Sequence, residues 1–425
     1  MQTDFNISTL PNGLRVVSVP MDTKSIAVLV LIGAGSRYED KQENGIAHFL
    51  EHMMFKGTKN RPSALLLAQE LEGMGAAYNA YTAKDQTGYW IKAAAHHKEK
   101  LLDILSDMTL HSLLSSEEIE REKGVITEEI NMYEDMPIRK IGSIYEELLY
   151  GDTPLGRDIA GTKETVLSFK RNDFTAYMDR FYRPNHAVVV IAGARGISQD
   201  EAERYFGAWQ QQPVSSFDLQ KESQSKPQIR INAKKTEQTH LCLGFRAFGL
   251  ADPRRYVLGL LSVVLGGGMS SRLFHEVRER RGLAYYIRTS TSKYQDVGNL
   301  VAQAGIDHRK VEEAVKVIQE EYYKMSRKNS GITDEELKRA KEFVKGHFIL
   351  SLEDSHEVAS LMAESLILEG RIRTPEEIIS GIDAVNTEEV TLLAGELFTP
   401  GRINLAGIGP FDKKAEDAVK ACILP

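Results

Sequence analysis

The second half of this 425-residue chain repeats the order of elements predicted in the first half, and no other feature restricts the fold as strongly. In each half a short β-branched strand precedes a glycine-ended helix, and a strand pair follows. The predicted segments are strands 14–19, 26–33, 77–83 and 87–94 with helix 42–57, then strands 240–249, 284–292 and 299–306 with helix 254–268. We therefore expect one fold used twice.

The length agrees with this repeat, because 425 residues exceed a single ordinary domain. Residues 211–227, "QQPVSSFDLQKESQSKP", are polar with a proline near each end, as is typical of a linker. We predict a first domain at 1–212, a linker at 213–226 and a second, homologous domain at 227–425. Further helices are expected at 98–110, 116–134, 172–181 and within 309–397, and further strands at 187–193 and 402–409.

The composition predicts a soluble, cytoplasmic protein. A net charge of −7 argues against nucleic acid as a partner, because phosphate binding needs a basic surface. Cys242 and Cys422 form no CxxC pair, which suits a reducing compartment and offers no sulfur-based metal site. The N-terminus lacks the features of a signal peptide, and no apolar run is long enough to span a membrane.

The two copies of the repeated helix differ at the motif "HFLEH". Aligning "AHFLEHMMFKG" with "VLGLLSVVLGG" places His48, Glu51 and His52 opposite Leu258, Leu261 and Ser262. The second copy shows that leucines suffice to build this helix. The polar residues of the first copy therefore need a functional reason.

Residues four apart on a helix lie on one face, so His48 and His52 are able to reach one ion, with Glu51 beside them. Imidazole suits zinc, and the His-x-x-Glu-His order is the inverse form of a known zinc motif. The alternative is a surface helix with His and Glu at ion-pair spacing. We favour a catalytic zinc site, which takes three protein ligands and leaves a position for water.

A third ligand is expected from the acidic helix "SSEEIEREKGVITEEINMYED". Two of its acids, Glu122 and Glu129, are seven residues apart and fall on the predicted apolar stripe, whereas Glu128 falls on the polar side. Carboxylates on a buried face need a cationic partner. The pattern thus selects Glu129 or Glu122, not Glu128. The stripe is expected to contain Val125, Ile126, Met132 and Tyr133.

These motifs resemble those of the pitrilysin-type (M16) zinc metallopeptidases, in the branch of the mitochondrial processing peptidase β-subunit and its bacterial relatives. The family pattern His-x-x-Glu-His followed by Glu-x6-Glu is present as "HFLEH" and "EKGVITEE". "NAYT", "DMP", "PLGRDIAGT" and "GGGMSSRLFHEVRERRGLAY" extend the resemblance over nearly the whole chain. It implies an α+β protein of two homologous domains with the LuxS/MPP-like metallohydrolase fold, each a mixed β-sheet packed with helices, facing each other as a clamshell.

The resemblance also implies roles for residues. It implies one Zn²⁺ per chain bound by His48, His52 and Glu129, with Glu51 as the general base and Glu122 as a supporting acid. The family's Arg-x6-Tyr pair corresponds to Arg278 and Tyr285, which would bind substrate and stabilise its carbonyl oxygen. From the residues alone, surface charge is the favoured interpretation of the arginines of this segment.

The strand "AYNAYTA" is an ordinary sheet strand from its sequence alone. The resemblance places it at a sheet edge near the metal, where a peptide adds through main-chain hydrogen bonds, so Asn79 and Ala80 would contact substrate. The function expected is that of a zinc endopeptidase acting on unfolded peptides, as a homodimer.

The competing interpretation is a non-catalytic structural or partner subunit, similar to the core proteins of the respiratory bc1 complex. Such a subunit has no need of His48, Glu51, His52 and Glu129 together.

Overall fold

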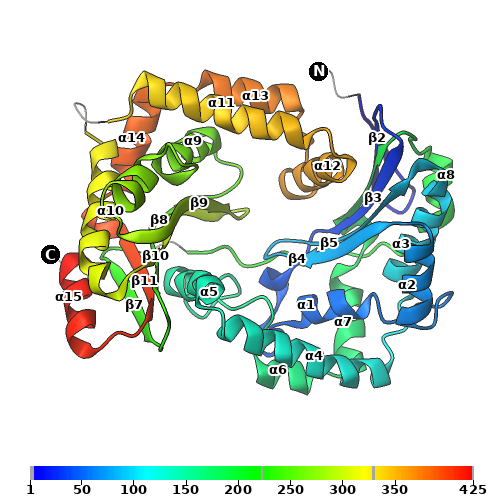
Figure 1. Cartoon of the computed structure of the whole chain (residues 1–425). Helices are drawn as coiled ribbons and strands as arrows, with labels where there is room; N and C mark the ends of the chain where they lie inside the picture. The colour runs from blue at the N-terminus through cyan, green and yellow to red at the C-terminus, as the bar shows by residue number, and fades with distance from the viewer. Residues whose placement is uncertain (1–3, 222–223, 328–330, 424–425) are drawn as a thin grey trace. The chain divides into compact units, whose positions relative to one another are not determined.

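A computed structural model describes residues 4–221, 224–327 and 331–423 of the chain (Figure 1). The chain forms two compact units, each built from three segments. The first unit comprises Met1–Asn131, Asp158–Asp218 and Phe348–Glu376, and the second comprises Met132–Arg157, Leu219–His347 and Glu377–Pro425. Each unit contains one sheet with helices on both of its faces.

The first unit contains a six-stranded sheet in the order β1-β2-β6-β3-β5-β4. β2 and β6 pair in parallel, and the other neighbours pair antiparallel. The sheet is therefore mixed, and β4 lies at one edge. The strands are β1 (Asn6–Thr9), β2 (Arg15–Pro20), β3 (Ser25–Ile32), β4 (Ala77–Thr82), β5 (Thr87–Ala94) and β6 (Ala187–Gly193).

Both faces of this sheet are buried. Along β3, Val28 and Val30 belong to the apolar core under most of the helices, while Leu29 and Leu31 belong to a second core on the opposite face. Only one helix, α12, supplies the buried helical side chains of that second core among the described residues (Figure 1). The helices of the unit are α1 (Ile46–Met53), α2 (Ala64–Gly73), α3 (Lys98–His111), α4 (Ser116–Glu134), α6 (Lys163–Ser168), α7 (Arg171–Phe181), α8 (Gln199–Phe206) and α12 (Ser355–Glu369).

The second unit repeats this plan with the sheet order β7-β11-β8-β10-β9. β11 and β7 pair in parallel, as β2 and β6 do, and β9 occupies the edge that corresponds to β4. The strands are β7 (Gln228–Ala233), β8 (Thr239–Phe248), β9 (Ala284–Lys293), β10 (Val297–Ile306) and β11 (Ile403–Gly409). The predicted internal repeat is thus confirmed at the level of sheet topology.

Helices cover this second sheet on both faces, with α5 on one side and the others opposite (Figure 1). Ile141, Ile144 and Leu149 of α5 pack on Cys242 and Val301 of the sheet. The helices are α5 (Pro137–Tyr150), α9 (Arg255–Gly266), α10 (Val311–Met325), α11 (Asp334–Ser351), α13 (Pro375–Ala384), α14 (Thr387–Leu397) and α15 (Lys413–Ile423).

Each compact unit contains one helix from the opposite half of the sequence. α5 comes from the first half of the sequence and packs on the second sheet, whereas α12 comes from the second half and packs on the first sheet. The sequence prediction placed contiguous residues in each domain, so the compact units differ from it by these two helices. No helix or strand lies between α8 and β7 in the part of the chain that the structure describes, where the linker was expected.

Most predicted elements are present, and the differences have local causes. The helix expected at 42–57 begins only at Ile46, because Gly45 adopts a left-handed φ of 98°. α2 was missed although Ser63 caps it by accepting from the N–H of Leu66. The sequence analysis also missed α5, α6, α8, α15, β1 and β7.

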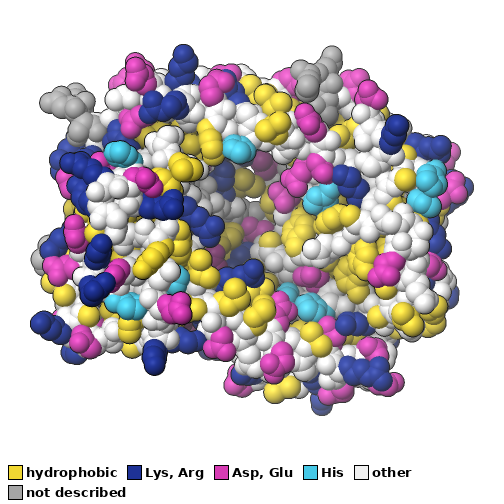
Figure 2. Space-filling model, in the orientation of Figure 1, with side chains coloured by type: hydrophobic (Ala, Val, Ile, Leu, Met, Phe, Trp, Pro, Cys, Tyr) yellow, Lys and Arg dark blue, Asp and Glu magenta, His cyan; other side chains and the backbone are white. Residues whose placement is uncertain are grey.

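The surface carries side chains of both charge signs, interspersed over the face that Figure 2 shows. None of the helices in the described ranges is both long and apolar enough to cross a membrane.

Candidate active site

The helix that carries HFLEH is anchored at its start by a buried acid. The Glu39 carboxylate accepts hydrogen bonds from the backbone N–H groups of Gly45 at 2.8 Å and Ala47 at 2.9 Å. Burial raises the pKa of Glu39 to about 8, although these hydrogen bonds lower it. A side chain at position 45 would lie 2.7 Å from the carbonyl oxygen of Ala160, so only glycine fits there. The start of α1 is therefore fixed before its first histidine.

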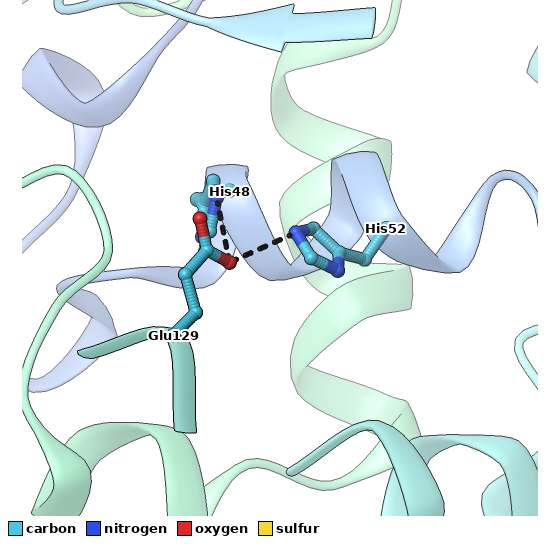
Figure 3. Close-up of side chains that lie close together, drawn as sticks. All are labelled: His48, His52 and Glu129. Carbon is cyan, nitrogen blue, oxygen red and sulfur yellow. Dashed lines mark ion pairs between the residues drawn. The ribbon is translucent and has the colours of Figure 1, made fainter. Parts of the chain in front are cut away.

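His48 and His52 of α1 and Glu129 of α4 converge on one point (Figure 3). Oε2 of Glu129 lies 3.7 Å from Nε2 of His48 and 3.5 Å from Nε2 of His52. One donor atom from each residue lies within 4.8 Å of the others, and no other such group of three occurs among the described residues. Two imidazole nitrogens and one carboxylate oxygen form a donor set that suits zinc with an open fourth position.

The second ring nitrogen of His52 is held by Glu122. Oε1 of Glu122 lies 2.9 Å from Nδ1 of His52, and its Oε2 pairs with Nζ of Lys56 at 2.6 Å. A carboxylate on Nδ1 directs Nε2 toward a metal and is a common feature of zinc sites. Lys56 was not predicted to take part, although it follows His52 by four residues, about one helical turn.

The two histidines have different proton affinities in the metal-free protein. Burial lowers the pKa of His48 to about 4, and the neighbouring His52 adds to this effect. Burial also lowers the pKa of His52, but its interactions with Glu122 and Glu129 outweigh this effect and raise the pKa to about 9. His48 is thus neutral at pH 7, as a ligand must be, whereas His52 carries a proton that a metal must displace.

Glu51 lies beside this group, and its carboxylate has one hydrogen-bond partner among the described residues. Oγ1 of Thr82, at the end of β4, donates to Oε2 of Glu51 at 2.6 Å. Burial raises the pKa of Glu51, and the hydrogen bond from Thr82 opposes the rise. An acid with a raised pKa next to a metal site is suited to accept and return a proton.

The two acids of α4 that the sequence pattern predicted as candidate ligands are less exposed than the neighbouring acid Glu128. Glu122 is 3% exposed and Glu129 is half-buried, whereas Glu128 is exposed and accepts from Asn131. The predicted apolar stripe of α4 was partly wrong, because two of its members, Val125 and Met132, are 52% and 46% exposed. The buried side of α4 runs instead through Ile119, Glu122, Lys123 and Ile126.

The strand with Asn79 and Ala80 is β4, which lies at the edge of the first sheet. Asn79 pairs with Trp90 of β5, and Ala80 pairs with Tyr89. The N–H of Ala80 donates to the side-chain oxygen of Asn79 at 2.9 Å. The outer side of β4 has no strand partner within the described chain, so it offers main-chain groups for pairing.

Arg278 and Tyr285 both belong to the second unit. Arg278 lies in a π-helical turn (Phe274–Glu279), where its guanidinium carbon is 4.7 Å from the centre of the Phe274 ring. Tyr285 is the second residue of β9 and is 61% exposed. Both side chains are accessible, and neither lies among the residues that form the group around Glu129.

The second unit has no counterpart of that group among its described residues. Leu258 and Leu261 of α9 are fully buried and Ser262 is 6% exposed, at the positions aligned with His48, Glu51 and His52. α9 is therefore an ordinary core helix, and the difference between the two copies predicted from sequence is present in the structure.

Comparisons with known proteins agree with this asymmetry. The family described as Insulinase (Peptidase family M16) matches residues 15–163, and the Peptidase M16 inactive domain matches residues 168–344. An uncharacterized zinc protease of Bacillus subtilis, YmxG, is 39% identical over 92% of this chain and 95% of its own length. An uncharacterized zinc protease of Mycobacterium leprae is 34% identical over 96% of this chain and 92% of its own length.

Solved structures show the same fold. The crystal structure of a protease from Helicobacter pylori matches with a TM-score of 0.88 and 25% identity, covering 96% of this chain and 100% of that one. A peptidase M16 inactive domain from Pseudomonas fluorescens matches with a TM-score of 0.88 at 18% identity, covering 96% and 98% of the two chains. The α+β fold of two homologous domains is thus confirmed, and the chain belongs to peptidase family M16.

Proposed function

We propose that the protein is a zinc-dependent endopeptidase that hydrolyses unfolded peptides, with one zinc ion per chain. The single observation that supports this most strongly is the convergence of His48, His52 and Glu129 beside Glu51. The names of the relatives support zinc and proteolysis. The donor set and its supporting carboxylate fit the metal.

His48, His52 and Glu129 would hold the ion, and Glu122 would keep the His52 ring oriented. When bound, zinc lowers the pKa of water to about 7 and polarises the scissile carbonyl. Glu51 would remove a proton from the attacking water and deliver it to the leaving amine. Its raised pKa suits both steps, because the group must take up a proton and then release it.

The substrate would add to the outer side of β4, with main-chain pairing at Asn79 and Ala80. Main-chain pairing depends little on the side chains of the peptide and requires an extended chain. Unfolded peptides are therefore the expected class of substrate. Arg278 and Tyr285 would hold the substrate and stabilise the carbonyl oxygen as charge develops on it. We propose that the protein acts in the cytoplasm as a homodimer, which light scattering of the purified chain tests.

The decisive experiment measures zinc content and peptide hydrolysis on the same sample. We expect about one zinc per chain, cleavage of an unstructured peptide library, loss of cleavage with a chelator and recovery on adding zinc back. Glu51→Gln is the matched control, since it removes the base and keeps every ligand. Zinc binding without hydrolysis by the wild type would instead favour a non-catalytic structural or partner subunit.

A further inference from the structure

We propose that Thr82 is a positioning residue for Glu51, and that its hydroxyl fixes the carboxylate of the base in the orientation that proton transfer needs. This inference rests on the proposed function. It concerns a residue that is not a ligand, belongs to another element than Glu51 and has no role assigned above.

The contact between the two side chains is short and direct. Oγ1 of Thr82 donates to Oε2 of Glu51 at 2.6 Å, and this is the one hydrogen bond that the Glu51 carboxylate makes to described residues. A glutamate side chain has three rotatable bonds, and a hydrogen bond to a charged oxygen is among the stronger constraints available to it. Without the hydroxyl, the carboxylate is held only by packing.

Thr82 is itself firmly placed. It is β-branched, which restricts its χ1, and it pairs with Thr87 of β5 at the end of the hairpin. Successive side chains of a strand point to opposite faces, so the neighbour Tyr81 points away from α1. The ring of Tyr81 packs on the core under α12, and its hydroxyl lies 3.5 Å from Oε1 of Glu364.

Glu364 also strengthens the hairpin itself, since Nε2 of Gln86 donates to the same oxygen at 2.9 Å. The end of β4 is thus tied to a helix on one face while it holds the base on the other. An incoming peptide paired along β4 would lie next to the strand that orients Glu51.

The second unit supplies an internal comparison. Thr289 is the sixth residue of β9, as Thr82 is of β4, and its Oγ1 donates to the backbone carbonyl of Ser262 in α9 at 2.5 Å. There the hydroxyl ties the edge strand to α9, because it also accepts from the Ser262 hydroxyl at 3.2 Å. In the first unit the hydroxyl at the same place in the edge strand donates to the carboxylate of Glu51, which is the arrangement expected of a positioning role.

The test compares Thr82→Val and Thr82→Ala, which lack the hydroxyl, with Thr82→Ser, which keeps it. Thr109→Val is the matched control, because the buried Thr109 hydroxyl donates to the carbonyls of Leu105 and Ser106 within its own helix, α3. For the hydroxyl-free variants we expect kcat to fall about 10- to 100-fold, the scale of a lost hydrogen bond to a charged group, with KM near wild type. Thr82→Ser should recover most of kcat, and zinc content and Tm should stay near wild type throughout.

A second measurement does not depend on activity. Crystal structures of the metal-free wild type and of Thr82→Val should show Glu51 in one conformation in the first and in several in the second. A single, unchanged Glu51 conformation in Thr82→Val, or an unchanged kcat, would overturn the inference. So would the loss of folding in both hydroxyl-free variants while Thr109→Val folds, since Thr82 would then be a structural tether. If the wild type hydrolyses no peptide, the proposed function fails, and the two crystal structures still decide the role of Thr82.

Discussion

Oε1 of Glu122 lies 2.9 Å from Nδ1 of His52, so an acid of α4 controls the protonation of a proposed zinc ligand on α1. Because interactions with Glu122 and Glu129 raise the pKa of His52 to about 9, the ring is an imidazolium in the metal-free protein at pH 7. In the metal-free protein, His52 therefore holds a proton that zinc binding would have to remove.

Zinc binding at pH 7 should therefore release about one proton per ion. The pKa is raised, so the proton is present below about 9 and zinc affinity should climb about tenfold per pH unit up to that value. Calorimetry in buffers of different ionisation enthalpy measures the release directly. Glu122→Gln should reduce it, because the charge that retains the proton is gone; release of no proton by the wild type would contradict this account.

Substitutions within HFLEH should distinguish the general base from the zinc ligands. Glu51→Gln should keep about one zinc per chain and abolish turnover, since the base is lost and the ligands remain. His48→Ala should lose the metal itself. Zinc analysis and peptide kinetics on the same preparations check both. Near-normal hydrolysis by Glu51→Gln would exclude Glu51 as the base.

Adjacent acids of α4 should behave differently. Glu129→Gln should weaken zinc binding and activity together, because its oxygen lies 3.5 Å from Nε2 of His52. Glu128→Gln is the matched control, since Glu128 is exposed and, among the described residues, accepts from Asn131 alone. Metal titration of the two variants decides the assignment, and the reverse result would make Glu128 the ligand.

Arg278 and Tyr285 should matter for turnover without affecting the metal. We expect Arg278→Ala and Tyr285→Phe to lower kcat/KM by about 10²-fold, the scale seen when one transition-state donor is removed. Zinc content and Tm should stay near wild type, because neither residue is a ligand and both are accessible. Arg280→Ala, in the same exposed turn, serves as a control for surface charge. Unchanged kinetics in both variants would mean that this turn is merely solvated.

The exchanged helix limits what a fragment can do. Residues 1–212 contain every proposed ligand and the base, so the ligand set alone would allow this segment to bind metal. They lack α12, whose Val358, Met362 and Leu366 cover Leu29 and Leu31 of β3. We expect the fragment to be insoluble or aggregated by light scattering, and α12 supplied as a fused segment to improve its solubility. A soluble, monomeric 1–212 fragment would show that this face is not needed for folding.

Local pattern predicted much of the molecule. Alternating and β-branched runs located β2, β3, β5, β6 and β8, and the spacing in HFLEH placed His48 and His52 on one face. The exchange of α5 and α12 was not predictable, because helix periodicity does not say which sheet a helix covers. The exposure of Val125 and Met132 was missed for the same reason, since an apolar residue on a helix is buried only if another element reaches it.

Contacts between side chains of different elements were also not predicted from the sequence. The Lys56 contact with Glu122 and the Thr82 contact with Glu51 join residues from separate elements, and their distances depend on packing between those elements. Lys56 offered a usable signal, because it lies about one helical turn after His52. Thr82 offered none beyond its place within "NAYT".

The hydrogen bond from the N–H of Ala80 to Asn79 means that the edge of β4 partly satisfies itself. A peptide pairing there must replace the amide oxygen of Asn79 with one of its own carbonyls, so that contact exchanges one hydrogen bond for another instead of adding one. Such an exchange contributes little net free energy. If substrate pairs along β4 as proposed, we expect its association to be weak and readily reversed, which would favour release of products. The same amide oxygen shields an open strand edge from pairing with other chains.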